Sequence, residues 1–156
     1  MHICNMKEEK RMVLEDNTRS CKGEFHVELI KNDMVVGRVD DHNLVVDSGR
    51  VRLAELSTGT STNHITHIGV GDGTDAEKAS DSTLGHQQLF ALEKASVSGR
   101  DARFDFVIDN SQANGLKIHE FGLFCADGVM FSHRVRSGVI EKADDITIKG
   151  YWILHF

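Results

Sequence analysis

Two histidines and an aspartate stand close together in the stretch His64-Ile-Thr-His-Ile-Gly-Val-Gly-Asp-Gly-Thr74, which makes it the first candidate for metal chemistry. Imidazole and carboxylate groups are common zinc ligands. The residues before Gly71-Asp72-Gly73 have β-forming character, however, and side chains three apart on a strand point to opposite faces. His64 and His67 therefore cannot bind one ion together with Asp72, and we expect no zinc site here.

The loop that follows also has the composition of a calcium or phosphate site. Asp72, Asp75 and Asp81 could supply oxygen ligands to calcium, but the spacing and the closing glutamate of an EF-hand are missing. The glycine-rich run from Gly69 to Gly73 lacks the Gly-Lys-Ser/Thr ending of a phosphate loop, and no helix is expected to open after it. We expect instead a turn in which Asp72 bonds to nearby backbone amides, with no metal and no cofactor.

No nucleophile stands out in the sequence. Ser48 precedes a glycine but lacks the Gly-x-Ser-x-Gly frame, and nine histidines make chance triads easy to draw. The most informative carboxylate is Glu120, in Ile118-His-Glu-Phe-Gly-Leu-Phe124, where alternation places it on the face of Ile118 and Phe124. We predict a buried structural acid, bonded to a backbone amide or to Arg134, and a protein that is not an enzyme.

Length and charge limit the function further. The chain has 156 residues, enough for one domain with a core, and no apolar run approaches the length of a membrane helix. A formal charge of −6, with scattered lysines and arginines, argues against a nucleic-acid-binding surface. We therefore expect neither nucleic acid nor membrane as a partner.

The three cysteines, Cys4, Cys21 and Cys125, form no Cys-x-x-Cys pair, which excludes a recognisable zinc ribbon or an intramolecular disulfide framework. One interpretation is three reduced thiols, with Cys125 buried in a strand. The alternative is an intersubunit disulfide formed by Cys4 or Cys21 of an N-terminal arm.

The hydrophobic pattern divides the chain into an arm, residues 1–22, and a single β-rich domain, residues 23–156. The arm is polar and without clean periodicity, which is typical of a segment that is disordered alone or ordered against a partner. In the domain, period-two alternation predicts strands at 25–30, 34–39, 42–46, 65–70, 89–97, 103–108, 116–125, 129–136 and 145–156.

Turn and cap residues punctuate these strands. Lys31-Asn32-Asp33 and Ala126-Asp127-Gly128 predict hairpin turns. One short helix is expected at about residues 49–57, capped by Asp47 or Ser48, with an Arg52–Glu55 pair and a stop at Gly59. In the last strand, Ile146, Ile148, Trp152, Leu154 and Phe156 share the face assigned to the core. The predicted fold is mainly β, an antiparallel β-sandwich or flattened barrel with one short helix.

The segment from Gly71 to Gly85 is long and polar for a compact domain, and loops of this length are more often functional or interface-forming than accidental. Its polar residues are therefore the predicted subunit interface: Asp72, Thr74, Asp75, Glu77 and Asp81.

Four segments in order resemble small bacteriophage virion proteins of the tail-fibre, collar and baseplate-attachment kind. They are His42-Asn-Leu-Val-Val-Asp-Ser-Gly49, Ile65-Thr-His-Ile-Gly-Val-Gly-Asp-Gly-Thr74, Ile118-His-Glu-Phe-Gly-Leu-Phe124 with its Ala-Asp-Gly turn, and Asp145-Ile-Thr-Ile-Lys-Gly-Tyr-Trp-Ile153. The resemblance covers roughly residues 24–156 and transfers no catalytic residues.

The resemblance implies a non-enzymatic structural subunit of a phage tail or neck. Such a protein would be a homo-oligomer that contacts other virion proteins, located in the virion after assembly in the host bacterial cytoplasm. Proteins of this kind commonly continue into a longer fibre, whereas this sequence ends at Phe156. The resemblance therefore favours a short collar, adaptor or fibre-attachment protein over a receptor-binding one.

Two other classes of function remain as alternatives. A carbohydrate-binding β-sandwich module would need exposed aromatic side chains, for which Tyr151 and Trp152 are the candidates. A metal-dependent hydrolase would have to use His64 or His67 with Asp72.

Overall fold

The computed structural model of the protein describes residues 22–156. The predicted arm, with Cys4 and Cys21, lies outside the described residues, except that Lys22 already begins the first strand. The strands are β1 (Lys22–Lys31), β2 (Met34–Val45), β3 (Ile65–Gly71), β4 (Gln88–Ala91), β5 (Lys94–Ser98), β6 (Asp101–Ile108), β7 (Lys117–Cys125), β8 (Met130–Glu141) and β9 (Ile146–His155), and the helix is α2 (Asp47–Thr58).

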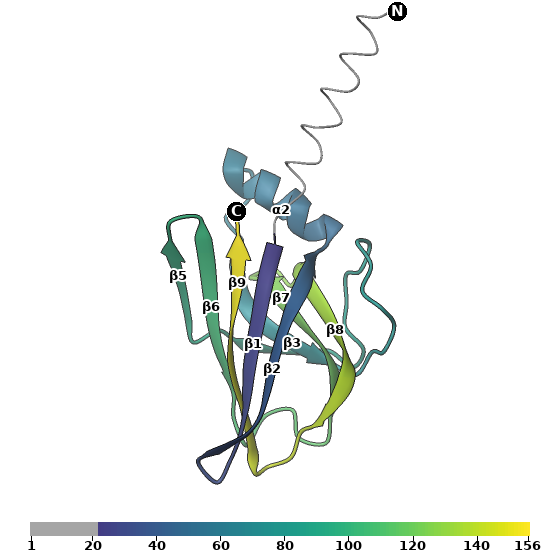
Figure 1. The fold of residues 1–156 in the computed structure, drawn as a ribbon. Helices are drawn as coiled ribbons and strands as arrows, with labels where there is room; N and C mark the ends of the chain where they lie inside the picture. Colours follow the sequence, from purple (N-terminus) through teal and green to yellow (C-terminus); the bar gives the residue numbers. More distant parts are fainter. Residues whose placement is uncertain (1–21) are drawn as a thin grey trace, which may run out of the picture.

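Over residues 22–156 the predicted mainly β architecture with one short helix is confirmed. All strand pairs are antiparallel and form one curled sheet, a half-barrel, in the order β4-β3-β7-β8-β2-β1-β9-β6-β5 (Figure 1). Strand β2 joins the two halves of this sheet, β4-β3-β7-β8 and β1-β9-β6-β5. Its residues up to Asn43 pair with β1, whereas Leu44 and Val45 pair with β8. The two outermost strands, β4 and β5, are consecutive in the chain.

The change of direction between β4 and β5 corrects one expectation. A single strand was predicted at 89–97, but the chain pairs with β3 up to Ala91 and with β6 from Lys94. At the corner, the N–H of Leu92 donates to Thr66 O (3.0 Å) and the N–H of Glu93 donates to Asp105 O (2.9 Å). These two bonds tie the corner to both halves of the curled sheet.

Aromatic side chains fill the space enclosed by the sheet. The ring of Phe25 packs against Phe121 (centroids 4.7 Å apart), Trp152 (5.0 Å) and Phe106 (6.1 Å). Trp152 is fully buried, so its assignment to the core is confirmed. Phe156, predicted for the same face, is 47% exposed because it lies beyond the end of β9.

Both predicted hairpin turns are present. Asn32 and Asp33 have positive φ values of 52° and 60°, the conformation that a two-residue turn between twisted strands requires. Gly128 has φ 85°, and its N–H donates to Cys125 O (2.9 Å).

The helix α2 packs on β8 with an unusual inner face. It buries Gly49 and Arg52 while Val51 stays 59% exposed, so its apolar residues do not form the inner face. Arg52 donates to both carboxylate oxygens of Asp127, at 2.8 and 2.6 Å, and to Glu55 at 3.4 Å. The Arg52–Glu55 pair is therefore confirmed.

The two ends of α2 differ in how well they were predicted. Gly59 ends the helix with φ 72°, as expected. The predicted cap is wrong, because Val46 holds the N-cap position without a side-chain bond and the Ser48 hydroxyl donates to Met130 O instead. In the described part of the chain no helix is long and apolar enough to cross a membrane.

Candidate functional site

The loop between β3 and β4 is anchored to the sheet by the buried carboxylate of Glu120 in β7. One oxygen of this carboxylate, Oε2, accepts the N–H groups of Gly73 (2.6 Å) and Gly85 (2.8 Å), which lie at the two ends of the loop. Glu120 is only 3% exposed. The predicted buried acid with a backbone-amide partner is thus in place, whereas Arg134, the other proposed partner, bonds elsewhere.

The glycines of Gly71-Asp72-Gly73 have a steric reason. A Cβ on Gly71 would lie 2.7 Å from Glu120 Oε2, and a Cβ on Gly73 would overlap the same atom. Glycine-rich backbone with N–H groups pointing inward is a common anion cradle, and here the anion is a carboxylate of the protein itself. The pattern that looked like a phosphate loop therefore serves the packing of Glu120.

His133 of β8 completes a buried chain of charges. Its Nε2 lies 2.8 Å from Glu120 Oε1 and its Nδ1 lies 2.8 Å from Asp81 Oδ2, while the residue is 4% exposed. Burial opposes the charged ring, but the hydrogen bonds to Glu120 and Asp81 outweigh it and raise the pKa of His133. Two carboxylate neighbours require two N–H donors, which only the imidazolium has.

The two carboxyl groups respond in the opposite sense. Burial acts to raise the pKa of Glu120 and of Asp81, but hydrogen bonds lower both pKa values overall. For Glu120 the donors are His133, Gly85 and Gly73, and for Asp81 they are the Lys78 backbone and His133. We call this network of Gly73, Asp81, Gly85, Glu120 and His133 the Glu120 latch.

A second contact anchors the same loop where β2 and β8 separate. Arg134 donates from Nε to Asp41 (2.7 Å) and from Nη1 to Glu77 (2.8 Å). The other oxygen of Glu77 accepts the N–H of Val135 in β8 (3.2 Å). The Glu77 carboxylate therefore takes the place that a strand paired with this part of β8 would occupy. Arg134 thus stabilises the loop through Glu77 and not through Glu120.

The five residues predicted as an interface separate into two groups. Thr74 and Asp75 are exposed, and Asp72 is partly exposed. The Asp72 carboxylate bonds to the His86 ring (2.8 Å) and not to backbone amides, so that prediction is wrong. Glu77 and Asp81 turn inward to Arg134 and His133. The latch lines a cavity of about 210 Å³ whose walls also include Thr74, Asp75, Ala76, Lys78 and Thr83.

The histidines of the β3 stretch are not brought together with Asp72. His64 Nδ1 lies 3.1 Å from Ile65 O, and His67 Nδ1 lies 2.7 Å from the Thr66 hydroxyl. Among residues 22–156, no three His, Cys, Asp or Glu side chains are arranged to hold a metal ion.

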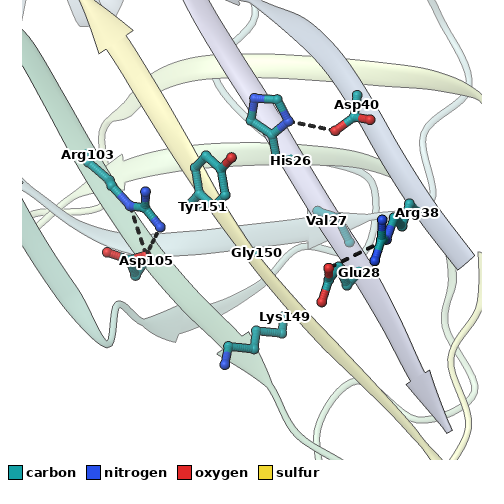
Figure 2. Close-up of a pocket in the computed structure, with 10 residues that line it drawn as sticks. All are labelled: His26, Val27, Glu28, Arg38, Asp40, Arg103, Asp105, Lys149, Gly150 and Tyr151. Carbon is teal, nitrogen blue, oxygen red and sulfur yellow. Dashed lines mark hydrogen bonds and ion pairs between the residues drawn. The ribbon is translucent and has the colours of Figure 1, made fainter. Parts of the chain in front are cut away.

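A larger groove, of about 380 Å³, lies on the outer face of the sheet, and sequence reasoning missed it (Figure 2). Its lining comes from β1, β2, β6 and β9: His26, Val27, Glu28, Arg38, Asp40, Arg103, Asp105, Lys149, Gly150 and Tyr151. The signal was present in the polar alternate positions of these strands, but only the strand order places them side by side. We call it the outer groove.

Tyr151 stands in the middle of the outer groove with neighbours on both sides. The His26 ring is 4.7 Å from the Tyr151 ring between centroids, and the Arg103 guanidinium is 3.9 Å from that centroid (Figure 2). Arg103 also bonds to Asp105 at 3.0 Å, and His26 to Asp40 at 2.6 Å. This arrangement gives the groove alternating charges and a tyrosine ring flanked from two directions.

Cys125 behaves as the first interpretation of the cysteines predicts. Its side chain is 1% exposed and free, and burial raises the pKa of its thiol to about 11. A thiol of this kind stays protonated and unreactive at neutral pH.

The chain was compared with models of protein families, with curated proteins and with solved structures, and none of them matches.

Proposed function

We propose that this protein is a non-enzymatic structural subunit of a bacteriophage virion, in the tail or neck, that acts by assembling with copies of itself and with other virion proteins. The observation that carries the proposal is the Glu120 latch, which holds a long polar loop in one conformation. A loop fixed from beneath loses little conformational entropy on binding, which favours its use as a contact surface.

The titratable groups of the latch support the same proposal, because their hydrogen bonds are made within the protein. Glu120, Asp81 and His133, whose pKa values are shifted, are bonded to one another and to backbone amides. Two of the four segments behind the phage resemblance meet in this network, because Gly73 belongs to one and Glu120 to the other. Their role here is to shape a surface whose exposed members are Thr74 and Asp75.

The test is the state of the full-length protein in solution and in particles. We expect light scattering to give a mass of several chains, and mass spectrometry to find the protein in phage particles from cells that carry its gene. Replacing Thr74 and Asp75 by alanine should leave folding intact and reduce incorporation. A stable monomer that is absent from purified particles would refute the proposal.

The outer groove favours one second candidate, a carbohydrate-binding module. Trp152 is buried and cannot contact a sugar, so this function would fall to Tyr151 and the carboxylates beside it. Because His26 and Arg103 flank the Tyr151 ring, a sugar would be held by hydrogen bonds more than by stacking. Glycan-array binding that is lost in Tyr151→Ala would support this candidate, and absence of binding would remove it.

A further inference from the structure

The edge of β2 is unpaired over most of its length. On one side β2 pairs with β1 from Met34 to Asn43, but on the other side only Leu44 and Val45 pair with β8. Below that point the two strands separate (Figure 1). A bulge at Val36 interrupts the ladder, and β2 pairs with β1 in regular register from Gly37 to Asn43.

This edge carries backbone groups that can pair with another strand. The N–H of Val46, just after β2, donates to Phe131 O on the β8 side, and alternate residues of a strand direct their N–H groups to the same side. The backbone N–H groups of Arg38, Asp40 and His42 therefore point away from β1. The N–H of His42 is bonded to the Asp41 carboxylate, so those of Arg38 and Asp40 remain available.

We propose that a second copy of this chain docks on this edge, by antiparallel two-fold pairing of β2 with β2 centred on Val39. The inference rests on the proposed function only in that it names the surface through which copies assemble. A strand edge with unpaired N–H and C=O groups is a template for another strand, and its symmetric partner is the same edge.

The charges of β2 select this register. Pairing centred on Val39 places Arg38 opposite Asp40 of the second copy, twice, with both side chains on the outer face. The neighbouring two-fold registers, centred on Arg38 or on Asp40, place like charges opposite each other and are disfavoured. In the single chain these side chains are 69% and 74% exposed, so both are accessible to a partner.

The contacts on the inner side fit the same register. Val39 opposes its own symmetry mate there, and it already packs partly against the core. Gly37 opposes Asp41, which is held by Arg134, and the missing side chain leaves room for that ion pair. Beyond Asp41 the pairing must stop, because the N–H of His42 is bonded to the Asp41 carboxylate and Leu44 is already paired with β8.

The pairing also continues the charge pattern of the outer groove. One row across the sheet runs Asp105, Tyr151, His26 and Asp40, and the next runs Lys149, Glu28 and Arg38 (Figure 2). In the proposed dimer, Asp40 at the end of the first row lies opposite Arg38 of the second copy, which begins that copy's second row. Positive and negative side chains then alternate through the junction, which is electrostatic complementarity between identical surfaces.

Charge reversal tests the register directly. In Arg38→Asp and in Asp40→Arg, each homodimer has two like-charged pairs, and we expect the dissociation constant measured by analytical ultracentrifugation to rise about tenfold or more. An equimolar mixture of the two variants should re-form the dimer, because every opposed pair is again Asp with Arg. Arg100→Asp, in the exposed turn between β5 and β6 and away from β2 in the strand order, makes the same charge change, and this matched control should associate as the unaltered chain does.

A cysteine at the centre gives a second, independent measurement. Opposed residues of a non-hydrogen-bonded pair have Cα atoms about 4.5 Å apart, within disulfide range. In a chain with Cys4 and Cys21 replaced by serine, Val39→Cys should form a disulfide-linked dimer under oxidation. Val97→Cys, on the exposed edge strand β5, should not.

The outcomes separate this inference from the proposed function. An assembled protein whose association is unchanged by both reversals, and whose Val39→Cys variant stays uncrosslinked, would overturn the β2 pairing and leave assembly through another surface. Failure of the mixed variants to associate would overturn it as well. A monomer at all concentrations that is also absent from particles would refute both.

Discussion

At the scale of single residues, the feature that organises this protein is a carboxylate held by backbone. Glu120 accepts hydrogen bonds from two loop N–H groups and from the imidazolium N–H of His133, so both its oxygens are bonded although it is only 3% exposed. A charged group is stable in such a place only when it is fully satisfied. The glycines at 71 and 73 are required because the carboxylate approaches them too closely for a Cβ.

Replacing Glu120 by glutamine should be strongly destabilising for this reason. The amide cannot accept every bond that the carboxylate accepts, and the charge of His133 loses one of its two partners. We expect a loss of about 3 kcal/mol in urea denaturation. Glu28→Gln, in an exposed pair with Arg38 at 3.5 Å, should cost less than about 0.5 kcal/mol. Equal effects of the two variants would contradict a structural role of the latch.

The latch should also give stability a defined pH dependence. The raised pKa of His133 means that its contribution is complete below the ordinary histidine value of 6.5 and is lost as pH rises through the higher folded value. The lowered pKa values of Glu120 and Asp81 mean that theirs is present above 4.5 and 3.8 and is lost as pH falls through the folded values.

We therefore expect the latch to be strongest in mildly acidic solution. The difference in unfolding free energy between the unaltered protein and His133→Gln should shrink from pH 6 towards pH 9 and also towards strong acid. Taking the difference cancels the contribution of His155, whose pKa is raised by its bond to Asp101. A difference that stays constant with pH would show that His133 is not charged in the fold.

At the scale of elements, the helix α2 is positioned by close contact and not by an apolar stripe. Its buried residues are Gly49 and Arg52, and a Cβ on Gly49 would overlap the carbonyl oxygen of Phe131. The Arg52 side chain reaches Asp127 in the turn between β7 and β8, and this bond raises the pKa of Arg52. The helix is thus fixed by one glycine contact and one ion pair.

Gly49→Ala should destabilise the protein although alanine is the better helix former. Displacing α2 from β8 is expected to cost about 1–3 kcal/mol, more than the propensity gained. Gly138→Ala is the control, since a Cβ there meets only the end of Arg136 at 3.5 Å. Thermal unfolding of both variants measures the difference, and a stabilised Gly49→Ala would show that α2 does not approach Phe131 this closely.

At the scale of the whole molecule, the curled sheet is held by strands that serve both halves. β2 pairs with β1 and then with β8, and the Leu92–Glu93 corner bonds to both β3 and β6. Strands β1, β7 and β9 have neighbours on both sides, whereas β4 and β5 have one each. Stability is therefore expected to differ from the middle of the sheet to its ends.

Hydrogen exchange measures this gradient. Amides of β1, β7 and β9 should exchange only by global unfolding, and amides of β5 should exchange orders of magnitude faster. The N–H groups of Arg38 and Asp40 should exchange rapidly in dilute protein and slow down as concentration rises, because the second copy covers them. Protection in β5 equal to that in β9 would contradict the strand order.

The sequence by itself determined the features that depend on near neighbours. Alternation along β9 assigned Trp152 to the core, and Asn32-Asp33 marked a hairpin turn because those residues tolerate positive φ. The phage resemblance and the interface residues remain proposals. Glu120 was recognised as buried, although it shares a face with Phe124 and not with Ile118, since the register is irregular between Ile118 and Glu120.

Only the tertiary structure decided what those residues meet. Gly73 and Gly85 lie 47 and 35 residues from Glu120 in sequence, and Asp81 lies 52 residues from His133. Contacts at such separations depend on strand order and register, which local periodicity does not encode. The outer groove and the free edge of β2 have the same origin, because both follow from which strands are neighbours and where β2 and β8 part.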